Sequence, residues 1–219
     1  MKDSNKIRLL LVDDHKILRD GLKKAIDQES DMILVGEAEN GRTALQLARE
    51  TLPDVIIMDI SMPELNGIEA ARQIIRQNCD QKIIALSMHA DKHYVLGMLK
   101  AGVKGYILKT NAFEELARAV RTIMTGQSFI SRELTTIVVK SAVTNFQCDT
   151  AKSSETLTSR EIEILQLIAE GKNSEYMAAE LNISRRTIEV HRRSLKKKLK
   201  LNTIADLTRY AIKTGIISL

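Results

Sequence analysis

The sequence has no apolar run long enough to cross a membrane. A bilayer-spanning helix needs about 20 mainly apolar residues, and no window of the 219 residues approaches that length. The first residues, Met1 to Lys6, also lack the apolar segment of a signal peptide. We therefore expect a protein that works in the cytoplasm without a membrane partner.

Cysteine is almost absent as well. The two cysteines, Cys79 and Cys148, lie far apart in the sequence, and neither belongs to a Cys-x-x-Cys pair. This spacing excludes a disulfide framework and gives no indication of a zinc site. Both are interpreted as ordinary thiols.

The remaining composition is that of a folded protein, with 44% apolar and 28% charged residues. The length suffices for one large domain or two small ones, and we expect two. Residues 155–219 hold 12 Lys/Arg and 8 Asp/Glu, which accounts for +4 of the net charge of +5. Within them, Arg185–Lys200 holds eight bases and one acid. Such a cluster suits a polyanion, although a solvated basic face is the alternative.

Short apolar runs and longer amphipathic stretches alternate through the first 125 residues. The apolar runs predict strands at Ile7–Val12, Met32–Val35, Val55–Met58, Ile83–Leu86 and Tyr106–Leu108. The amphipathic stretches predict helices at Lys16–Glu29, Gly41–Glu50, Ile68–Gln77, Lys92–Ala101 and Ala112–Thr125. Five βα units in succession predict an α/β domain with a doubly wound parallel sheet covered by helices on both faces.

Polar side chains stand where four of these strands end. Asp13 and Asp14 follow the first strand, Asp59 the third, Ser87 the fourth and Lys109 the fifth. Each alone could be a surface residue, but the ligands of such sheets bind beyond the carboxyl ends of the strands. We therefore expect these side chains to meet in one functional site.

Clustered carboxylates repel one another unless a cation lies among them, and a hard divalent ion such as Mg²⁺ prefers oxygen ligands. Lys109 would add positive charge and Ser87 a hydrogen-bond donor, a combination that stabilises a phosphoryl group during transfer. Asp59 is the candidate nucleophile, because a carboxylate can form an aspartyl-phosphate. Three nearby histidines lack a metal-binding spacing and are interpreted as surface or loop residues: His15, His89 and His93.

Asp13-Asp14, Asp59 with Met62-Pro63, Ser87 and Lys109 together resemble the receiver domain of two-component response regulators, over about residues 6–125. The resemblance implies a flavodoxin-like (βα)5 fold in which Asp59 accepts a phosphoryl group from a sensor histidine kinase. It assigns Mg²⁺ to Asp14, Asp59 and the carbonyl of Ser61, with Asp13 acting through water. It assigns the phosphoryl oxygens to Ser87 and Lys109. Tyr106 occupies the switch position of the family, where it would act with Ser87; a half-buried strand tyrosine is the alternative.

Two residues depart from the receiver pattern. Thr110 follows Lys109 where many receivers have proline, so we expect a trans peptide bond there. Met88 follows Ser87 where a smaller residue is frequent, and its bulk would narrow access to a phosphoryl group.

After residue 125 the sequence predicts a connector and a second domain. Arg132–Ala142 predicts a further helix, and residues 143–156 have the polar composition of a flexible linker. Thr158-Ser159-Arg160-Glu161 is a capping box that begins a helix, which Gly171 ends. A second helix follows from Asn173 to about Leu181, and Ser184 caps a third, basic helix. Two helices joined by a tight turn predict a helix-turn-helix.

On a helical wheel, Ile188, Leu195 and Leu199 form the apolar face of the third helix. The opposite face of a recognition helix contacts the edges of DNA bases in the major groove, while flanking Lys and Arg side chains neutralise phosphates. The expected base contacts are Arg193 with guanine, Glu189 with a cytosine amino group and Val190 with a thymine methyl. The expected phosphate contacts are Arg185, Arg186, Lys196 and Lys197.

Leu157–Glu161, Gly171-Lys172 and Ser184–His191 together resemble the LuxR-type DNA-binding domain, over about residues 153–218. Joined to a receiver, this is the arrangement of the NarL/FixJ family of transcriptional regulators. Two residues depart from the pattern, because Tyr176 replaces a frequent capping glutamate and Glu189 replaces a common basic residue. The last predicted helix, Ile204–Thr214, resembles the dimerisation helix of the family, with simple core packing as the alternative.

The resemblance implies a receiver domain at 5–125, a partly helical linker at 126–152 and a smaller all-α helix-turn-helix domain at 153–219. The expected protein is a response regulator rather than a turnover enzyme. Phosphorylation of Asp59 would drive homodimerisation and binding to double-stranded DNA, and so regulate transcription. One alternative is a Mg²⁺-dependent phosphatase with Asp59 as nucleophile, which would need an acid at the position of Ser61. The other is a constitutive DNA-binding protein whose receiver serves only dimerisation.

Overall fold

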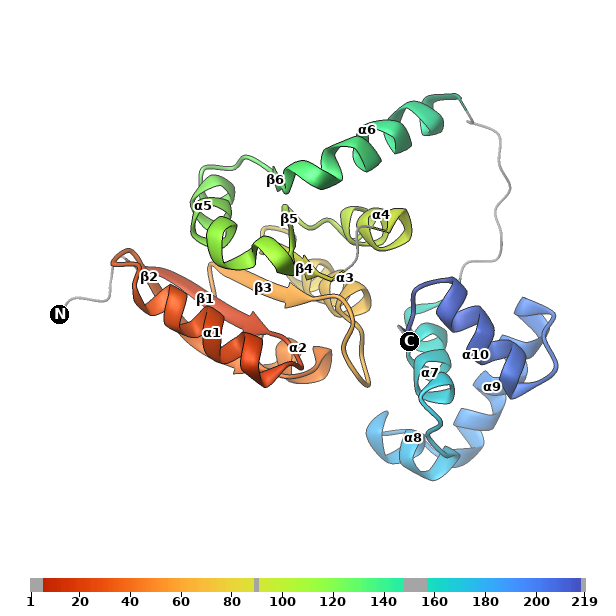
Figure 1. Cartoon of the computed structure of the whole chain (residues 1–219). Coiled ribbons are helices and arrows are strands. Elements are labelled where there is room, and N and C mark those ends of the chain that lie inside the picture. Colours follow the sequence, from red (N-terminus) through yellow and green to blue (C-terminus); the bar gives the residue numbers. More distant parts are fainter. Residues whose placement is uncertain (1–5, 89–90, 148–156, 218–219) are drawn as a thin grey trace. The chain divides into compact units, whose positions relative to one another are not determined.

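The computed structural model describes residues 6–88, 91–147 and 157–217. The chain forms two compact units, residues 1–148 and 149–219 (Figure 1), and each unit has its own apolar core. Within the described ranges, none of the helices combines the length and the apolar character that a bilayer crossing requires.

The N-terminal unit alternates strands with helices, as the sequence predicts. Its strands are β1 (Ile7–Val12), β2 (Met32–Ala38), β3 (Val55–Asp59), β4 (Lys82–Ser87), β5 (Gly105–Leu108) and β6 (Phe129–Ile130). Its helices are α1 (Lys16–Asp27), α2 (Gly41–Thr51), α3 (Gly67–Gln77), α4 (Lys92–Ala101), α5 (Ala112–Met124) and α6 (Arg132–Gln147), with a 3-10 turn at Lys109–Asn111.

The described strands form one parallel sheet in the order β2-β1-β3-β4-β5-β6. Along the central strand β3, Val55 and Ile57 face one apolar cluster while Ile56 and Met58 face the other, and all four are fully buried. A strand buried on both faces needs this uninterrupted apolar run. The predicted doubly wound α/β fold is therefore confirmed.

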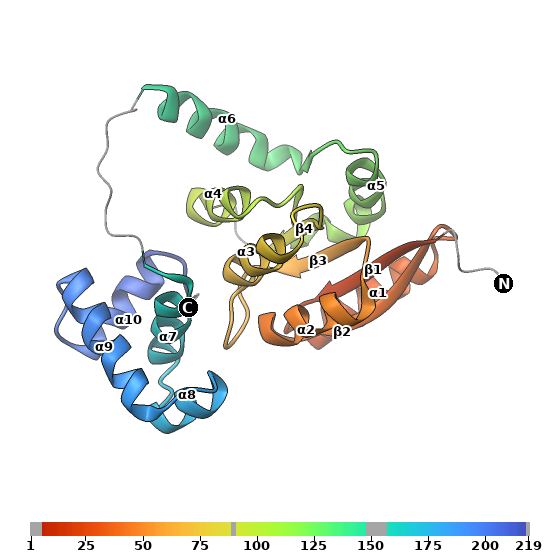
Figure 2. The same cartoon turned by 180° about the vertical axis from the view of Figure 1, so that it is seen from behind.

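Helices cover both faces of the sheet, as the opposite views in Figure 1 and Figure 2 show. Helices α1 and α5 contribute Leu22, Ile26, Leu116 and Val120 to the core on one face. Helices α2, α3 and α4 pack on the other face, where α6 adds Leu134. Ligands of such sheets bind at the edge formed by the carboxyl ends of the strands, between these two layers of helices.

Strand β6 was not predicted from the sequence. It pairs in parallel with β5, Phe129 opposite Gly105 and Ile130 opposite Tyr106. Two residues are too few to show an alternating pattern, so only the tertiary structure reveals it. The added strand covers backbone groups of β5 that an edge strand would otherwise expose.

Helix α6 continues to Gln147, so residues 143–147, which the sequence analysis interpreted as linker, are helical. The buried side chain of Leu134 and the partly buried Ile137 and Val138 fix the first turns on the core. Each later residue then adds one hydrogen bond to an existing helix, and no proline or glycine interrupts the run. The remainder of the predicted linker, residues 148–156, lies outside the described residues.

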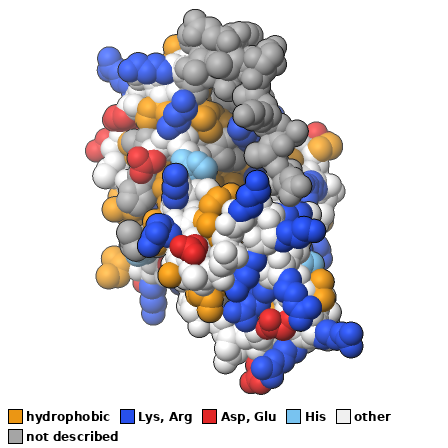
Figure 3. All heavy atoms as spheres, turned by 90° about the vertical axis from the view of Figure 1, so that its right-hand side faces the viewer, with side chains coloured by type: hydrophobic (Ala, Val, Ile, Leu, Met, Phe, Trp, Pro, Cys, Tyr) orange, Lys and Arg blue, Asp and Glu red, His pale blue; other side chains and the backbone are white. Residues whose placement is uncertain are grey.

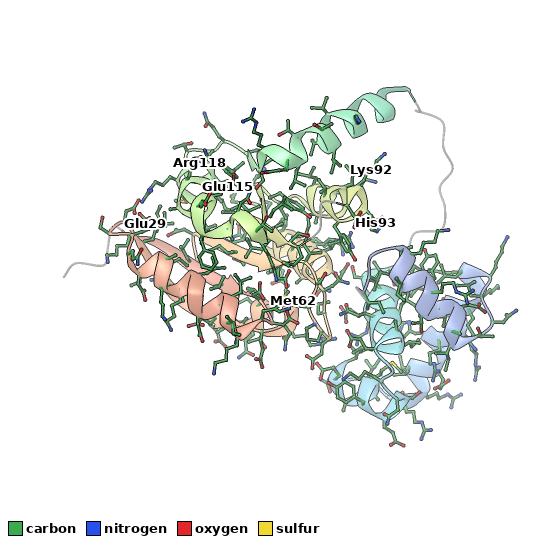
Figure 4. The ribbon with its side chains drawn as sticks, viewed as in Figure 1. Glu29, Met62, Lys92, His93, Glu115 and Arg118 are labelled. Carbon is green, nitrogen blue, oxygen red and sulfur yellow. The ribbon has the colours of Figure 1, made fainter. Side chains whose placement is uncertain are left out.

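Ser131 holds the start of α6 against the sheet. Its backbone N–H donates to the carbonyl of Tyr106 at 2.9 Å, and its hydroxyl oxygen accepts from the N–H of Leu108 at 3.3 Å. The same hydroxyl donates to the carboxylate of Glu115, which lies on α5 beside Arg118 (Figure 4). These hydrogen bonds place the start of α6 beside the end of β5.

The C-terminal unit is all helical: α7 (Ser159–Ala169), α8 (Ser174–Glu180), α9 (Arg185–Leu199) and α10 (Ile204–Lys213). The predicted capping box at Thr158 is confirmed, since its hydroxyl accepts from the N–H of Glu161 and that carboxylate accepts from the N–H of Thr158. Gly171 follows α7 with a φ of +76°, the left-handed conformation that the sequence predicted for this position. The predicted all-α second domain is therefore confirmed.

Gly67 should be irreplaceable at the start of α3. A Cβ atom on Gly67 would lie 1.9 Å from the carbonyl oxygen of Asp59, a backbone atom that cannot turn aside. Gly67→Ala should therefore lower the free energy of unfolding by about 3 kcal/mol or more, measured by urea unfolding followed by circular dichroism. Gly126→Ala is the control: nothing lies within 4 Å of its added Cβ, and only its φ of +85° is unfavourable, at a cost of about 1 kcal/mol. Equal losses for both variants would contradict the clash.

Candidate functional site

Strand register brings the predicted site residues to one edge of the sheet. Asp59 pairs with Leu86, and Ser87 pairs with Leu108, the residue before Lys109. Because all these strands run parallel, their carboxyl ends lie side by side. The polar residues at the strand ends are therefore neighbours in space although they are far apart in the sequence.

Lys109 joins two of the carboxylates. Its Nζ lies 2.7 Å from Oδ2 of Asp59 and 2.7 Å from Oδ2 of Asp13. The three residues are 6%, 2% and 0% exposed, respectively. Ion pairs in such a dry setting are strong, and none of the three charges would be tolerated there alone.

Two buried carboxylates share one ammonium, so the cluster keeps an excess of negative charge. Burial and the neighbouring charge of Asp13 raise the pKa of Asp59 to about 6, although Lys109 opposes them. Burial alone would lower the pKa of Lys109, but its contacts with Asp59 and Asp13 outweigh burial and raise it. The site therefore favours a further positive charge.

The donor atoms present fit a hard divalent cation. Ligand atoms of Asp13, Asp14, His15 and Asp59 all lie within 4.8 Å of one another. Oδ2 of Asp13 is buried and makes no hydrogen bond of good geometry, its approach to Lys109 being an ion pair. Carboxylate oxygens are the ligands that Mg²⁺ prefers, so the residues fit the cation expected from the sequence.

His15 contacts the cluster, which the sequence analysis missed. Its Nδ1 lies 2.8 Å from Oδ1 of Asp14 and 3.1 Å from Oδ1 of Asp13, while the side chain stays 63% exposed. The available signal was its position directly after the acidic pair. His93 is exposed, as expected, lies on α4 (Figure 4) and does not belong to this cluster of ligand atoms. His89 lies outside the described residues.

Ser87 and Tyr106 form a second contact at this edge. Tyr106 is fully buried rather than half-buried, and its phenol hydrogen-bonds with the side chain of Ser87. Burial raises the pKa of Tyr106 to about 12. Ser87 is 2% exposed and ends β4, the strand beside the one that ends with Asp59. Its hydroxyl is thus held by a buried ring on the next strand, β5.

The remaining predicted residues lie around Asp59. The N–H of Ser61 approaches Oδ1 of Asp59 at 3.4 Å, a long hydrogen bond. Met88 is 63% exposed, so most of its side chain lies in solvent. Among the described residues there is no cis peptide bond, and Lys109-Thr110 is trans as expected.

Helices α8 and α9 form the predicted helix pair. The turn between them contains Asn182 with a φ of +50°, a conformation that asparagine tolerates better than most residues. On α9, Ile188 and Leu195 are buried, as the helical wheel predicts. Most of the predicted contact residues are exposed: Arg185, Arg186, Val190, Arg193 and Lys197, with Lys196 partly exposed. Figure 3 shows a face of the molecule on which Lys and Arg side chains gather.

Two of these residues have partners within the unit. Arg185 pairs with Glu175 at 3.0 Å, with both side chains largely exposed. Glu189 accepts hydrogen bonds from Ser174 at 2.7 Å and Arg192 at 3.2 Å. On this face, side chains such as Arg193 and Lys197 are exposed to solvent, whereas Arg185 and Glu189 already contact other residues of the unit.

Glu161 connects α7 to α9 below this face. Its carboxylate accepts from Nζ of Lys198 at 2.8 Å and from the hydroxyl of Ser194 at 2.9 Å. Burial alone would raise the pKa of Glu161, but the hydrogen bonds from Lys198, the N–H of Thr158 and Ser194 outweigh burial and lower it to about 2. This buried acid fixes α9 from its inner side.

Two family models match the chain. The model described as response regulator receiver domain matches residues 9–121, which is more than half of the sequence. The model described as bacterial regulatory proteins, luxR family, matches residues 155–211. Each match falls within one of the two compact units.

Known proteins resemble the chain over its whole length. The transcriptional regulatory protein MctR of Rhizobium johnstonii is 35% identical and the match covers 100% of this chain and 99% of MctR. The oxygen regulatory protein NreC of Staphylococcus epidermidis is 37% identical, with 96% and 99% covered. A solved structure of two RcsB dimers bound to two parallel DNAs superimposes with a TM-score of 0.60 at 25% identity, covering 96% of this chain and 99% of RcsB.

The pKa of Asp59 should respond in opposite directions to its two charged neighbours. Asp13→Asn should lower it below about 6, because a neighbouring negative charge is removed, and Lys109→Met should raise it, because a positive charge is lost. Carbon-13 NMR titration of metal-free protein labelled at its aspartate carboxyls measures both shifts. Asp20→Asn, on the exposed side of α1, should leave the pKa unchanged. Shifts of the same sign for the two variants would refute the assigned causes.

Stability of the C-terminal unit should depend on pH through Glu161. Its pKa is lower in the folded chain, about 2, than its ordinary value of 4.5, so its ionised form stabilises the fold above pH 4.5 and this stabilisation is lost as the pH falls towards 2. Glu161→Gln should lower the free energy of unfolding by about 3 kcal/mol at pH 7, with the difference from wild type shrinking below pH 4.5. Urea unfolding at a series of pH values tests this; Glu175→Gln, an exposed glutamate, should show no such difference.

Proposed function

The chain belongs to the NarL/FixJ-type response regulators of two-component systems, and on this premise we propose that phosphorylation of Asp59 by a sensor histidine kinase controls its binding to DNA. As a response regulator with a receiver and a LuxR-type DNA-binding domain, it regulates transcription. The observation that carries the proposal is the buried contact of Lys109 with Asp59 and Asp13, which places the carboxylate of Asp59 beside the ammonium group of Lys109.

Asp59 is the phosphoryl acceptor. In its ionised form, a carboxylate oxygen attacks the phosphorus of a phosphohistidine on the kinase. The oxygen–phosphorus bond forms as the phosphorus–nitrogen bond breaks, and the histidine nitrogen leaves with the electron pair. Each chain accepts one phosphoryl group, so this chemistry is a switch rather than the turnover of an enzyme.

Mg²⁺ is the proposed cofactor, held by Asp14, Asp59 and the carbonyl of Ser61, with Asp13 acting through water. When bound, the cation supplies positive charge that offsets the phosphoryl oxygens. The excess negative charge of the cluster and the closeness of its ligand atoms, which all lie within 4.8 Å of one another, support this assignment. The ammonium of Lys109, now divided between two carboxylates, then pairs with a phosphoryl oxygen.

Ser87 and Tyr106 form the proposed switch. The hydroxyl of Ser87 turns to a phosphoryl oxygen once Asp59 is modified, and the buried Tyr106 repacks with it. The hydrogen bond between the two side chains supports the coupling. Since the connector is hydrogen-bonded to the carbonyl of Tyr106 through Ser131, a change at this ring reaches the base of α6.

The second domain binds double-stranded DNA through α9. Arg193 and Val190 read base edges in the major groove, while Arg185, Arg186, Lys196 and Lys197 neutralise phosphates. The exposure of this basic face supports the assignment. Proposed domain limits are 5–125 for the receiver, 126–152 for the linker and 153–219 for the DNA-binding domain.

Phosphorylation favours a homodimer, in which two copies of α9 bind two half-sites of an operator. The solved structure of RcsB dimers on DNA supports this arrangement. Because its proposed target is chromosomal DNA, the protein is assigned to the cytoplasm.

Asp59→Asn should abolish the switch. Incubation with a small acyl phosphate and Mg²⁺ should add one phosphoryl group to the wild-type chain, detected by mass spectrometry, and none to Asp59→Asn. Affinity for a promoter fragment should rise on phosphorylation by about tenfold or more in wild type only, measured by fluorescence anisotropy.

Asp20→Asn is the matched control, because it removes an exposed aspartate of α1 and should behave as wild type. An increase in DNA affinity that persists in Asp59→Asn would refute the switch without refuting DNA binding. A chain that binds DNA equally with and without the donor would instead favour a constitutive DNA-binding protein.

A further inference from the structure

The side chain of Glu189 ties the two helices of the DNA-binding pair together. It lies in the second turn of α9, and its Oε1 accepts a hydrogen bond of 2.7 Å from the hydroxyl of Ser174. Ser174 is the first residue of α8 and is only 9% exposed. The hydrogen bond therefore joins the first residue of α8 to the second turn of α9.

Arg192 closes the arrangement into a triangle. Its Nη1 donates to the hydroxyl oxygen of Ser174 at 2.9 Å and to Oε1 of Glu189 at 3.2 Å. The Arg192 side chain is 23% exposed and that of Glu189 is 43% exposed. Hydrogen bonds to ionised groups are roughly twice as strong as neutral ones, so the triangle is a firm contact although it lies at the surface.

The charge of Glu189 matches this role. The hydrogen bond from Ser174, together with the charge and hydrogen bond of Arg192, lowers the pKa of Glu189 and outweighs burial, which alone would raise it. The carboxylate is thus ionised at neutral pH and compensated by an arginine of the same helix. It does not face DNA phosphates as an unpaired negative charge.

Neighbouring residues on α9 are exposed and are not held in this way. Val190 is 55% exposed, and Arg193 is exposed with no hydrogen bond or ion pair to any residue that the structure describes. Both can meet a base without giving up a contact within the protein. Glu189 would first have to release Ser174 and Arg192.

We propose that Glu189 is a positioning residue, which fixes α9 against α8 through Ser174 and Arg192 and so presents Val190 and Arg193 to DNA without contacting a base. The inference rests on the proposed DNA-binding function and replaces the cytosine contact expected from the sequence. Removing either Glu189 or Ser174 breaks the same contact, so both changes should have the same consequence.

Hydrogen exchange of the full-length chain tests the contact in the absence of DNA. Glu189→Ala and Ser174→Ala should each make the amides of α8 and the first turns of α9 exchange about fivefold faster, and the double variant should be no faster than the single ones. Lys213→Ala is the control, because it removes an exposed side chain of α10 and should change nothing in α8 or α9. Unchanged exchange in Glu189→Ala would overturn the proposal.

Selection of binding sites from a pool of random duplexes, with each full-length chain first phosphorylated by a small acyl phosphate and Mg²⁺, tests the role in recognition. Wild type, Glu189→Ala and Ser174→Ala should select the same bases at every position, and the two variants should bind the selected duplex about fivefold more weakly. Loss of preference at one base pair in Glu189→Ala alone would overturn the proposal, since that pattern marks a base contact. If wild type selects no sequence, the proposed DNA binding fails, and hydrogen exchange alone decides whether Glu189 holds α9.

Discussion

The contact of one buried ammonium with two buried carboxylates joins the ends of three strands of the N-terminal unit. Lys109 follows β5, Asp59 ends β3 and Asp13 follows β1, so their meeting requires three parallel strands in register. The apolar core on both faces of the sheet excludes water and makes each of these charges dependent on the others. The same burial raises the pKa of Asp59 to about 6 and leaves the cluster in need of a further cation. Fold and chemistry are thus consequences of one arrangement.

In the C-terminal unit, too, acidic side chains are held by neighbouring donor groups, but here the result is a basic surface. Two of its acids are engaged by side chains of α9 and α8: Glu161 accepts a hydrogen bond from Lys198, and Glu189 accepts hydrogen bonds from Ser174 and Arg192. Many of its bases remain open to solvent. Engaging Glu189 within the protein leaves basic side chains exposed on the same helix, Arg193 and Lys197 among them, and exposed positive charge is the property that a polyanion recognises. The proposed positioning by Glu189 and the proposed recognition of DNA by Val190 and Arg193 therefore rest on different side chains of one helix.

Much of the fold could be predicted because periodicity reports burial directly. The apolar run Val55–Met58 and its counterparts gave the five main strands, and capping residues such as Thr158 gave helix starts within a residue or two. The failures share one cause. Strand β6 and the extension of α6 to Gln147 depend on an existing sheet edge and an existing helix that lend them stability. Neither has a pattern of its own in the sequence.

The sequence by itself determined which residues stand at the strand ends, because strand boundaries fix where Asp13, Asp59, Ser87 and Lys109 fall. It also determined that these ends share one edge, because successive βα units form parallel sheets. Only the tertiary structure decided which groups touch: that Lys109 is divided between two carboxylates, that His15 contacts the acidic pair and that Glu189 is engaged by Ser174. Periodicity specifies the face on which a side chain lies, whereas a contact between side chains depends on distances of a few ångströms between elements that are remote in the chain. Those distances are set by the packing of the whole core.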